Sequence, residues 1–170
     1  RCTYSVTVNV DITNLKSALK SRGLKAYPAQ IYLIASAVNG VKEFRMAFDE
    51  DEQLGYWDYL HPAYTIFHSE TEMFSSVWTP YHSNFEKFYS HCVADMKTYE
   101  SSTALFPKKD IPPNVFDVSS LPWLNFTGFN LNLYTEGTHL LPIFTIGKYI
   151  TQEGKTIMPL AIQVHHAVCD

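Results

Sequence analysis

The sequence predicts an α/β protein, a two-layer sandwich in which helices cover a large mixed β-sheet. Three observations predict this fold class. Residues 2–10 alternate between apolar and polar side chains, which is typical of a strand with one exposed face. Residues 28–40 are apolar on nearly every side at helical spacing, as in a buried helix. From residue 115 onward, short β-rich runs follow one another, which indicates several further strands.

The first half of the chain alternates between helical and extended patterns. Apolar residues recur at helical spacing over residues 13–23 and stop at Gly23, which predicts a short amphipathic helix. Four extended runs come after the buried helix, the first two as a hairpin around an acidic turn. They lie at residues 44–48, 54–58, 64–68 and 73–78.

The second half begins with a helix and continues with strands. Ser83 or Asn84 can cap a long helical pattern, and the Pro-rich link 106–113 separates this helix from the β-rich remainder of the chain. The remaining strands are expected at 115–119, 125–133, 142–150 and 155–168. No internal repeat or low-complexity segment interrupts the pattern, so we expect one domain.

The composition excludes several classes of function. The chain has 170 residues, a formal net charge of −4 and only 13 scattered Lys and Arg residues, which argues against nucleic acid as a partner. No apolar run reaches the length of a membrane span, so no membrane partner is expected. The cysteines are odd in number and widely spaced, which favours a reducing cytoplasm.

The last expected strand carries two adjacent histidines, His165 and His166. Because the pleat turns neighbouring residues to opposite sides, His166 shares the apolar side with Leu160, Ile162 and Val164. The two imidazoles cannot then bind one metal ion, and we expect no metal site. A neutral imidazole has an unperturbed pKa of about 6.5, so His166 is a candidate general base near neutrality. A hydrogen-bonded core histidine is the alternative that the residue pattern leaves open.

The chain resembles a known enzyme family through several motifs. The terminal run His165-His166-Ala167-Val168-Cys169-Asp170 resembles the His-His-x-x-x-Asp-Gly signature of CoA-dependent acyltransferases, and its Ala-Val-Cys filling resembles the chloramphenicol acetyltransferase family in particular. Further blocks agree with that family in order and spacing: Ser119-Ser120-Leu121-Pro122-Trp123, Phe129-Asn130-Leu131-Asn132, Pro142-Ile143-Phe144-Thr145 and Lys148-Tyr149. The resemblance covers essentially the whole chain. It implies transfer of an acetyl group from acetyl-CoA to the primary (3-) hydroxyl of chloramphenicol, which inactivates the antibiotic.

The resemblance also implies four catalytic positions. His166 matches the base that removes the proton from the acceptor hydroxyl, which attacks the thioester directly in a ternary complex. Ser119 matches the serine that stabilises the oxyanion, a role that supplies about 3 kcal/mol in other enzymes. Thr145 matches a residue that positions water beside the oxyanion. Asp170 matches an aspartate that pairs with an arginine and organises the site, although that arginine has no counterpart here.

Binding positions for both substrates are implied by the same resemblance. Those that match the antibiotic pocket are mostly aromatic or apolar: Cys2, Tyr4, Phe74, Phe106, Phe129, Leu131 and Ile143. Those that match the acetyl-CoA site are Lys25, Tyr27, Trp123 and Lys148. Acetyl-CoA is therefore expected as a cosubstrate, with no permanently bound cofactor.

The resemblance implies a bacterial cytosolic homotrimer with active sites at the subunit interfaces. We expect residues 1–170 to form a single acetyltransferase domain that lacks the family's N-terminal segment and C-terminal helix. Two alternatives stay open. One is an inactive trimeric binding or assembly module of the same fold, and the other is a catalytic core like that of dihydrolipoyl acyltransferases.

Overall fold

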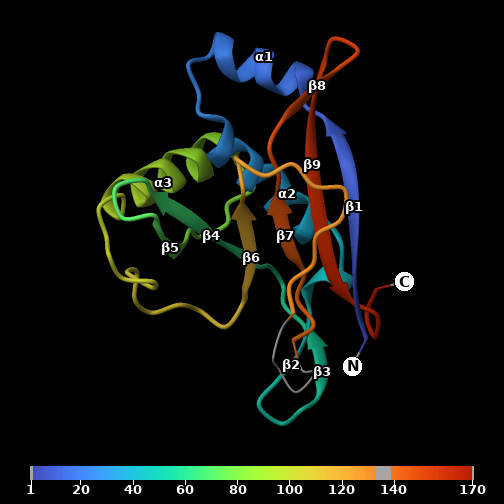
Figure 1. Ribbon diagram of the computed structural model, residues 1–170. Helices are drawn as coiled ribbons and strands as arrows, with labels where there is room; N and C mark the ends of the chain where they lie inside the picture. The colour runs from blue at the N-terminus through green and yellow to red at the C-terminus, as the bar shows by residue number, and fades with distance from the viewer. Residues whose placement is uncertain (1, 133–138, 170) are drawn as a thin grey trace.

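The computed structural model describes residues 2–132 and 139–169. The elements in chain order are β1 (Thr3–Asp11), α1 (Thr13–Ser21), α2 (Ala26–Gly40), the 3₁₀ helix η1 (Glu43–Arg45), β2 (Met46–Phe48), β3 (Leu54–Tyr56), β4 (His61–His68), β5 (Met73–Trp78), α3 (Phe85–Thr98), β6 (Val115–Ser120), β7 (Ile143–Ile146), β8 (Ile150–Gln152) and β9 (Lys155–His165). Figure 1 shows the large sheet with the helices packed against it, so the expected α/β fold class is confirmed.

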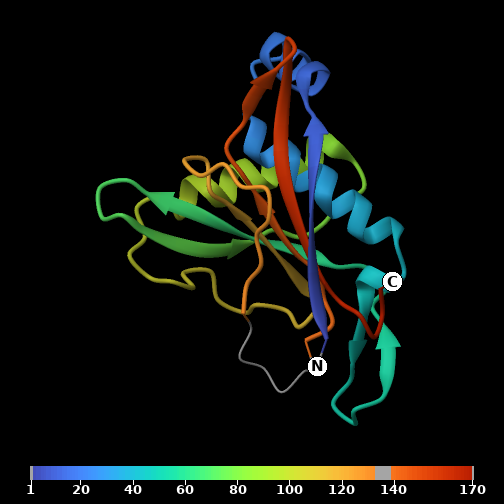
Figure 2. The ribbon, with the colours of Figure 1, turned by 45° about the vertical axis from the view of Figure 1, so that its right-hand side comes forward.

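One mixed sheet contains most of the strands. Its order is β1-β9-β7-β6-β4-β5, and β8 pairs with the start of β9. The strands β4, β6 and β7 run parallel, whereas the pairs β1–β9, β7–β9 and β4–β5 are antiparallel. The expected hairpin, β2 with β3, forms a separate small sheet at the end of the molecule where β1 begins and β9 ends (Figure 2).

Helices α2 and α3 cover one face of the sheet, behind it in Figure 2. Ile31, Ile34 and Val38 of α2 are buried in the same core cluster as Phe144 of β7 and Leu160 of β9. Each large apolar side chain buried in this way contributes about 1.5–3 kcal/mol relative to an exposed one. The expected burial is confirmed for this face of the helix, whereas Leu33 and Ala37 on its other side are exposed.

The opposite face is crossed by the segment 121–132, which forms no helix or strand. Contacts with side chains hold the backbone of this segment in place. The amide of Gln163 on β9 accepts from the Leu131 N–H (2.6 Å) and donates to the Leu131 carbonyl (2.9 Å). The Phe126 ring packs so closely on Gly147 that an added Cβ would lie 2.9 Å from it. This segment therefore forms an irregular cover that is fixed to the sheet.

The parallel strands β4 and β6 stay paired for only part of their length. Their register ends at Tyr64 and Val118. Beyond this point the rest of β4 pairs with β5, and Ser119 and Ser120 of β6 pair with β7. Figure 1 shows the end of β4 turning away to the left of β6. The sheet thus separates on one side of Ser119, and this separation positions the site.

Four expected strands differ from the structure. The run 44–48 begins within the 3₁₀ helix η1 and is a strand only from Met46. The strand expected at 125–133 is absent over its described part, because side chains rather than a neighbouring strand satisfy its backbone. The run 142–150 is interrupted after Ile146, where β7 ends before β8 begins. The strand expected at 155–168 ends at His165, because the amides of two later residues donate to the His165 carbonyl and form a turn.

Local signals at several element ends agree with the structure. The Asn84 side chain caps α3 by accepting from the Lys87 N–H (3.0 Å). Positive φ angles at Glu153 (49°) and Gly154 (77°) form the tight turn between β8 and β9. Within the described ranges, none of the helices has both the length and the apolar character needed to cross a bilayer.

Candidate active site

Two hydroxyl side chains meet in the middle of the sheet. Ser119 on β6 and Thr145 on β7 are register partners, and their Oγ atoms share a hydrogen bond of 3.0 Å. Thr145 is buried and Ser119 is half-buried. Because side chains alternate along β6, Ser119 faces away from the core side to which Phe116 and Val118 point. The pair offers a hydrogen-bond donor that is held in place before any ligand binds.

An apolar cavity of about 560 Å³, here called the outer cavity, opens over Ser119 on the face opposite the helices. Five of the expected antibiotic-pocket residues line it together: Phe74, Phe106, Phe129, Leu131 and Ile143. Phe74 and Phe106 remain 52% and 51% exposed. Large aromatic side chains left exposed around one cavity are typical of a binding surface.

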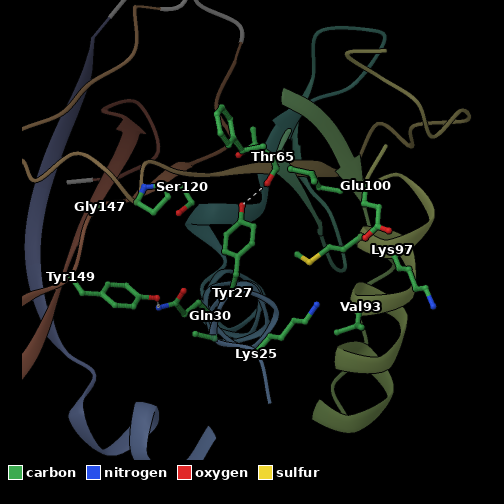
Figure 3. A pocket seen from close by; sticks show the side chains of 15 residues that line it. Lys25, Tyr27, Gln30, Thr65, Val93, Lys97, Glu100, Ser120, Gly147 and Tyr149 are labelled. Carbon is green, nitrogen blue, oxygen red and sulfur yellow. Dashed lines mark hydrogen bonds between the residues drawn. The ribbon is translucent and has the colours of Figure 1, made fainter. Parts of the chain in front are cut away.

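A second cavity, here called the inner cavity, has a volume of about 710 Å³ and lies on the helix-covered side (Figure 3). The expected acetyl-CoA residues Lys25 and Tyr27 line it. The Tyr27 hydroxyl donates to the Thr65 carbonyl (3.1 Å), and burial raises the pKa of Tyr27, which keeps this donor neutral. Lys97 and Glu100, from the end of α3 and just beyond it, add one charge of each sign to the wall.

The two cavities meet where the sheet separates. Thr65, Phe67 and Ser120 line both of them. Phe67 also packs against Trp123, with the ring centroids 5.0 Å apart. Because β4 no longer pairs with β6 at this level, a ligand from the helix side and a ligand from the opposite side can approach each other beside Ser119.

His166 lies one residue beyond the end of β9. Its backbone N–H donates to the Cys2 carbonyl (2.8 Å), which extends the pairing of β1 with β9. Its ring meets the Tyr4 ring edge to face with centroids 6.0 Å apart, and its Nδ1 lies 3.3 Å from the Cys169 carbonyl oxygen. The imidazole is exposed. Cys2 and Tyr4 thus lie beside His166 and apart from the other five expected pocket residues.

Register places His166 far from Ser119 in the same chain. Ala161 of β9 pairs with Thr145, Thr145 pairs with Ser119, and His166 lies five positions after Ala161. At about 3.4 Å per residue along β9 and about 4.8 Å per strand across the sheet, the two Cα atoms are about 19 Å apart. His166 also continues the alternation of Val164 on the core side of β9, whereas Ser119 faces the other side. One chain therefore cannot bring both side chains to one substrate group.

His165 occupies the face that Ser119 shares. It is buried, and its Nδ1 accepts a hydrogen bond from the Ala167 N–H (3.1 Å). Its Nε2 is buried without a hydrogen-bond partner in the part of the chain that the structure describes. The contact from Ala167 leaves the proton of the neutral ring on Nε2 and fixes the turn after β9. No group of three or more His, Cys, Asp or Glu among residues 2–132 and 139–169 is placed to hold a metal ion.

Comparison with known proteins assigns the family. A family model described as chloramphenicol acetyltransferase matches residues 1–170. The chain belongs to the chloramphenicol acetyltransferase family. The chloramphenicol acetyltransferase of Bacillus pumilus is 58% identical over 170 residues, which are 100% of this chain and 77% of that protein. The one from Clostridium butyricum is 54% identical, over 100% of this chain and 78% of the relative.

Solved structures agree on the fold. A chloramphenicol acetyltransferase superposes with a TM-score of 0.85 at 23% identity, over 99% of this chain and 81% of that one. The dihydrolipoamide acetyltransferase of Azotobacter vinelandii superposes with a TM-score of 0.74 at 15% identity, over 99% and 74%. Both likenesses concern the fold alone. The much higher sequence identities lie within the chloramphenicol acetyltransferase family, so a dihydrolipoyl acyltransferase core is not favoured.

Besides Cys2 and Tyr4, three further residues expected from the family resemblance lie elsewhere or outside the described chain. Trp123 lines the outer cavity rather than the inner one, although its contact with Phe67 puts it at their junction. Lys148 is exposed and lines neither of the two cavities; its backbone N–H donates to the Leu124 carbonyl (2.8 Å). Asp170 lies outside the described residues.

Sequence analysis missed two polar features of the cavities. In the inner cavity, the amide of Gln30 donates to the Tyr149 hydroxyl (2.6 Å), and Gln30 is 3% exposed. A Gln among the apolar residues of the first half of this helix is a signal that could have identified it. In the outer cavity, Asp117 lies on the wall two residues before Ser119. The sequence feature that could have identified Asp117 is an acidic residue within a strand, between the apolar residues Phe116 and Val118.

Proposed function

We propose that this chain transfers the acetyl group of acetyl-CoA to the primary hydroxyl of chloramphenicol and so inactivates the antibiotic. The observation that carries the proposal is the meeting of two cavities beside Ser119, one on each side of the sheet. Two substrates that react directly need separate entrances and one shared meeting point. Membership of the chloramphenicol acetyltransferase family supports the choice of both substrates.

In this proposal the inner cavity binds acetyl-CoA. Lys25 and Tyr27 line it, and a lysine offers a point charge for phosphate groups. The pantetheine chain would extend toward Ser120, where the cavities meet. Trp123 at the junction and Lys148 on the surface remain proposed contacts for the same cosubstrate. Acetyl-CoA is consumed in each turnover and CoA leaves, so no permanently bound cofactor is proposed.

The outer cavity binds chloramphenicol. Its aromatic wall suits a nitrophenyl ring and a dichloromethyl group. The base His166 removes the proton of the primary hydroxyl as the hydroxyl oxygen bonds to the thioester carbonyl carbon. Ser119 donates a hydrogen bond to the oxyanion, and Thr145, which is hydrogen-bonded to Ser119, positions water beside it. The C–S bond then breaks, and His166 returns the proton to the CoA thiolate.

The proposal requires more than one subunit. His166 lies on the other side of the sheet from Ser119 of the same chain and about 19 Å away. We propose that His166, with Cys2 and Tyr4 beside it, faces the outer cavity of a neighbouring subunit in a homotrimer. Asp170 is proposed to organise the turn that holds His166. The setting proposed for this reaction is the bacterial cytoplasm.

Release of CoA thiol tests the reaction. We expect thiol release from acetyl-CoA that depends on chloramphenicol, together with 3-acetylchloramphenicol as the product. His166→Ala should abolish that release, while His91→Ala, which removes an exposed imidazole of α3 that lines neither cavity, serves as the matched control and should retain it. An intact wild-type protein without chloramphenicol-dependent release would leave the inactive assembly module as the better description. Full activity in His166→Ala would refute the assignment of the base.

A further inference from the structure

Asp117 is one of two charged residues, with Glu72, on the described wall of the outer cavity, whose other lining residues are apolar, aromatic or hydroxyl-bearing. It lies on β6 between Ala63 of β4 and Ile143 of β7, its register partners on either side. Strand alternation turns it to the same face as Ser119, two residues further on. Asp117, Ser119 and Ile143 all line the cavity. The carboxylate therefore shares the chamber in which Ser119 is proposed to act.

The carboxylate of Asp117 has no hydrogen bond or ion pair among the described residues. The described cavity wall holds one other charged residue, Glu72, and no Lys, Arg or His. Burial raises the pKa of Asp117, and the nearby charge of His139 only partly opposes this. Asp117 is nevertheless exposed to solvent in the free protein, so its carboxylate gains from a hydrogen-bond donor when a bound substrate displaces the water around it. Asp117 thus lacks a donor in the described part of the protein and faces the space where an acceptor substrate would lie.

The spacing along β6 relates this carboxylate to the reacting group. Two residues on one face of a strand are about 6.7 Å apart. In chloramphenicol, three carbon atoms join the primary hydroxyl oxygen to the secondary hydroxyl oxygen. A substrate with its primary hydroxyl beside Ser119 can therefore extend its secondary hydroxyl along β6 toward Asp117.

We propose that Asp117 determines acceptor specificity: its carboxylate accepts a hydrogen bond from the secondary (1-) hydroxyl and selects alcohols with a donor at that distance from the acetylated oxygen. This inference rests on the proposed function. It adds to the apolar wall a single polar contact that recognises one group of the acceptor. An acceptor without that hydroxyl would displace water from the carboxylate and offer no donor in its place, which is the arrangement that gives strong discrimination.

The test compares two acceptors with two forms of the intact enzyme. The acceptors are chloramphenicol and its analogue with hydrogen in place of the secondary hydroxyl. The forms are wild type and Asp117→Ala, with kcat/KM measured by thiol release from acetyl-CoA. A hydrogen bond to a charged group predicts that wild type prefers chloramphenicol by about 10- to 100-fold and that the preference falls to within about threefold in Asp117→Ala. Asp117→Asn, which keeps the side-chain shape, should show an intermediate preference.

Controls distinguish a failure of this inference from a failure of the proposed function. Thermal unfolding followed by circular dichroism checks that each variant is folded, and Asp117→Asn keeps the test available if Asp117→Ala unfolds. Equal use of both acceptors by wild type, or an undiminished preference in both Asp117 variants, overturns the inference while the acetyltransferase proposal stands. A preference that is lost in Glu72→Gln and kept in Asp117→Asn also overturns it. No acetylation of either acceptor by wild type refutes the proposed function itself.

Discussion

Subunit mixing offers a direct test of where the two catalytic groups come from. The perturbation consists of two single variants, His166→Ala and Ser119→Ala, each of which is expected to be nearly inactive alone. Removal of one oxyanion donor typically lowers kcat by about 10²–10³. If the base and the oxyanion donor come from neighbouring subunits, a mixed trimer contains sites in which an intact His166 faces an intact Ser119.

The activity expected from mixed trimers follows from the geometry of the sheet. A Cα separation of about 19 Å, with the side chains on opposite faces, prevents one chain from supplying both groups. In a closed cyclic trimer with random mixing of equal amounts, about one quarter of all sites pair an intact His166 with an intact Ser119. Refolding or coexpressing the two variants together should therefore restore about one quarter of wild-type activity per site.

The assay is thiol release from acetyl-CoA on trimers isolated after mixing. The matched control mixes wild type with a chain that carries both substitutions. Equal mixing predicts about one quarter of wild-type activity if sites lie between subunits and about one half if each site lies within a subunit. A mixture of the two single variants no more active than its separate components would refute the reasoning, provided that heterotrimers are demonstrated by differently tagged chains.

Three further predictions concern single side chains. Ser119→Ala should lower kcat for chloramphenicol about 10²–10³-fold with little change in KM, because the lost hydrogen bond forms in the transition state; a change confined to KM would contradict this. Lys108→Met should lower the free energy of unfolding by about 2–3 kcal/mol, because its ammonium lies 2.8 Å from Asp95 Oδ1 with both side chains 19% exposed. Chemical denaturation tests this against Arg22→Met, which removes an exposed pair and should cost at most about 1 kcal/mol. Burial raises the pKa of Asp117 above its ordinary 3.8, so wild type loses stability as pH rises through the folded-state pKa. Asp117→Asn should therefore raise the melting temperature at neutral pH and lose this advantage below pH 3.8, and an advantage that persists in acid would contradict the assignment.

Much of the fold could be predicted from local patterns. The alternation of residues 2–10 predicts a strand and the apolar run at 28–40 predicts a helix, and the structure confirms both elements. The Asn84 cap could be predicted for the same reason, because its geometry depends on neighbouring residues. The structure does not confirm the burial expected of every apolar residue in the strand and the helix, since Val6, Val8 and Leu33 are exposed. The segment 125–132 was misassigned, because Gln163, distant in sequence, holds its backbone in place of a strand.

The site was predictable in its chemistry and less so in its arrangement. The five aromatic and apolar residues from Phe74 to Ile143 were expected in one pocket, and the structure brings them together in the outer cavity. Cys2 and Tyr4 were expected there as well and lie beside His166. Asp117 went unnoticed, because a single acidic residue in a strand has no meaning until its face and its neighbours are known.

By itself, the sequence determined which chemical groups are available: the adjacent histidines, the hydroxyl of Ser119, the alternation that turns His165 and His166 to opposite sides, and the family to which these motifs belong. Only the tertiary structure decided where the groups lie. The pairing of β4 with β6 ends at Tyr64 and Val118 and brings two cavities together beside Ser119. Strand register then separates His166 from Ser119 within one chain. Pairing between residues distant in sequence sets both features, and no local pattern encodes such pairing.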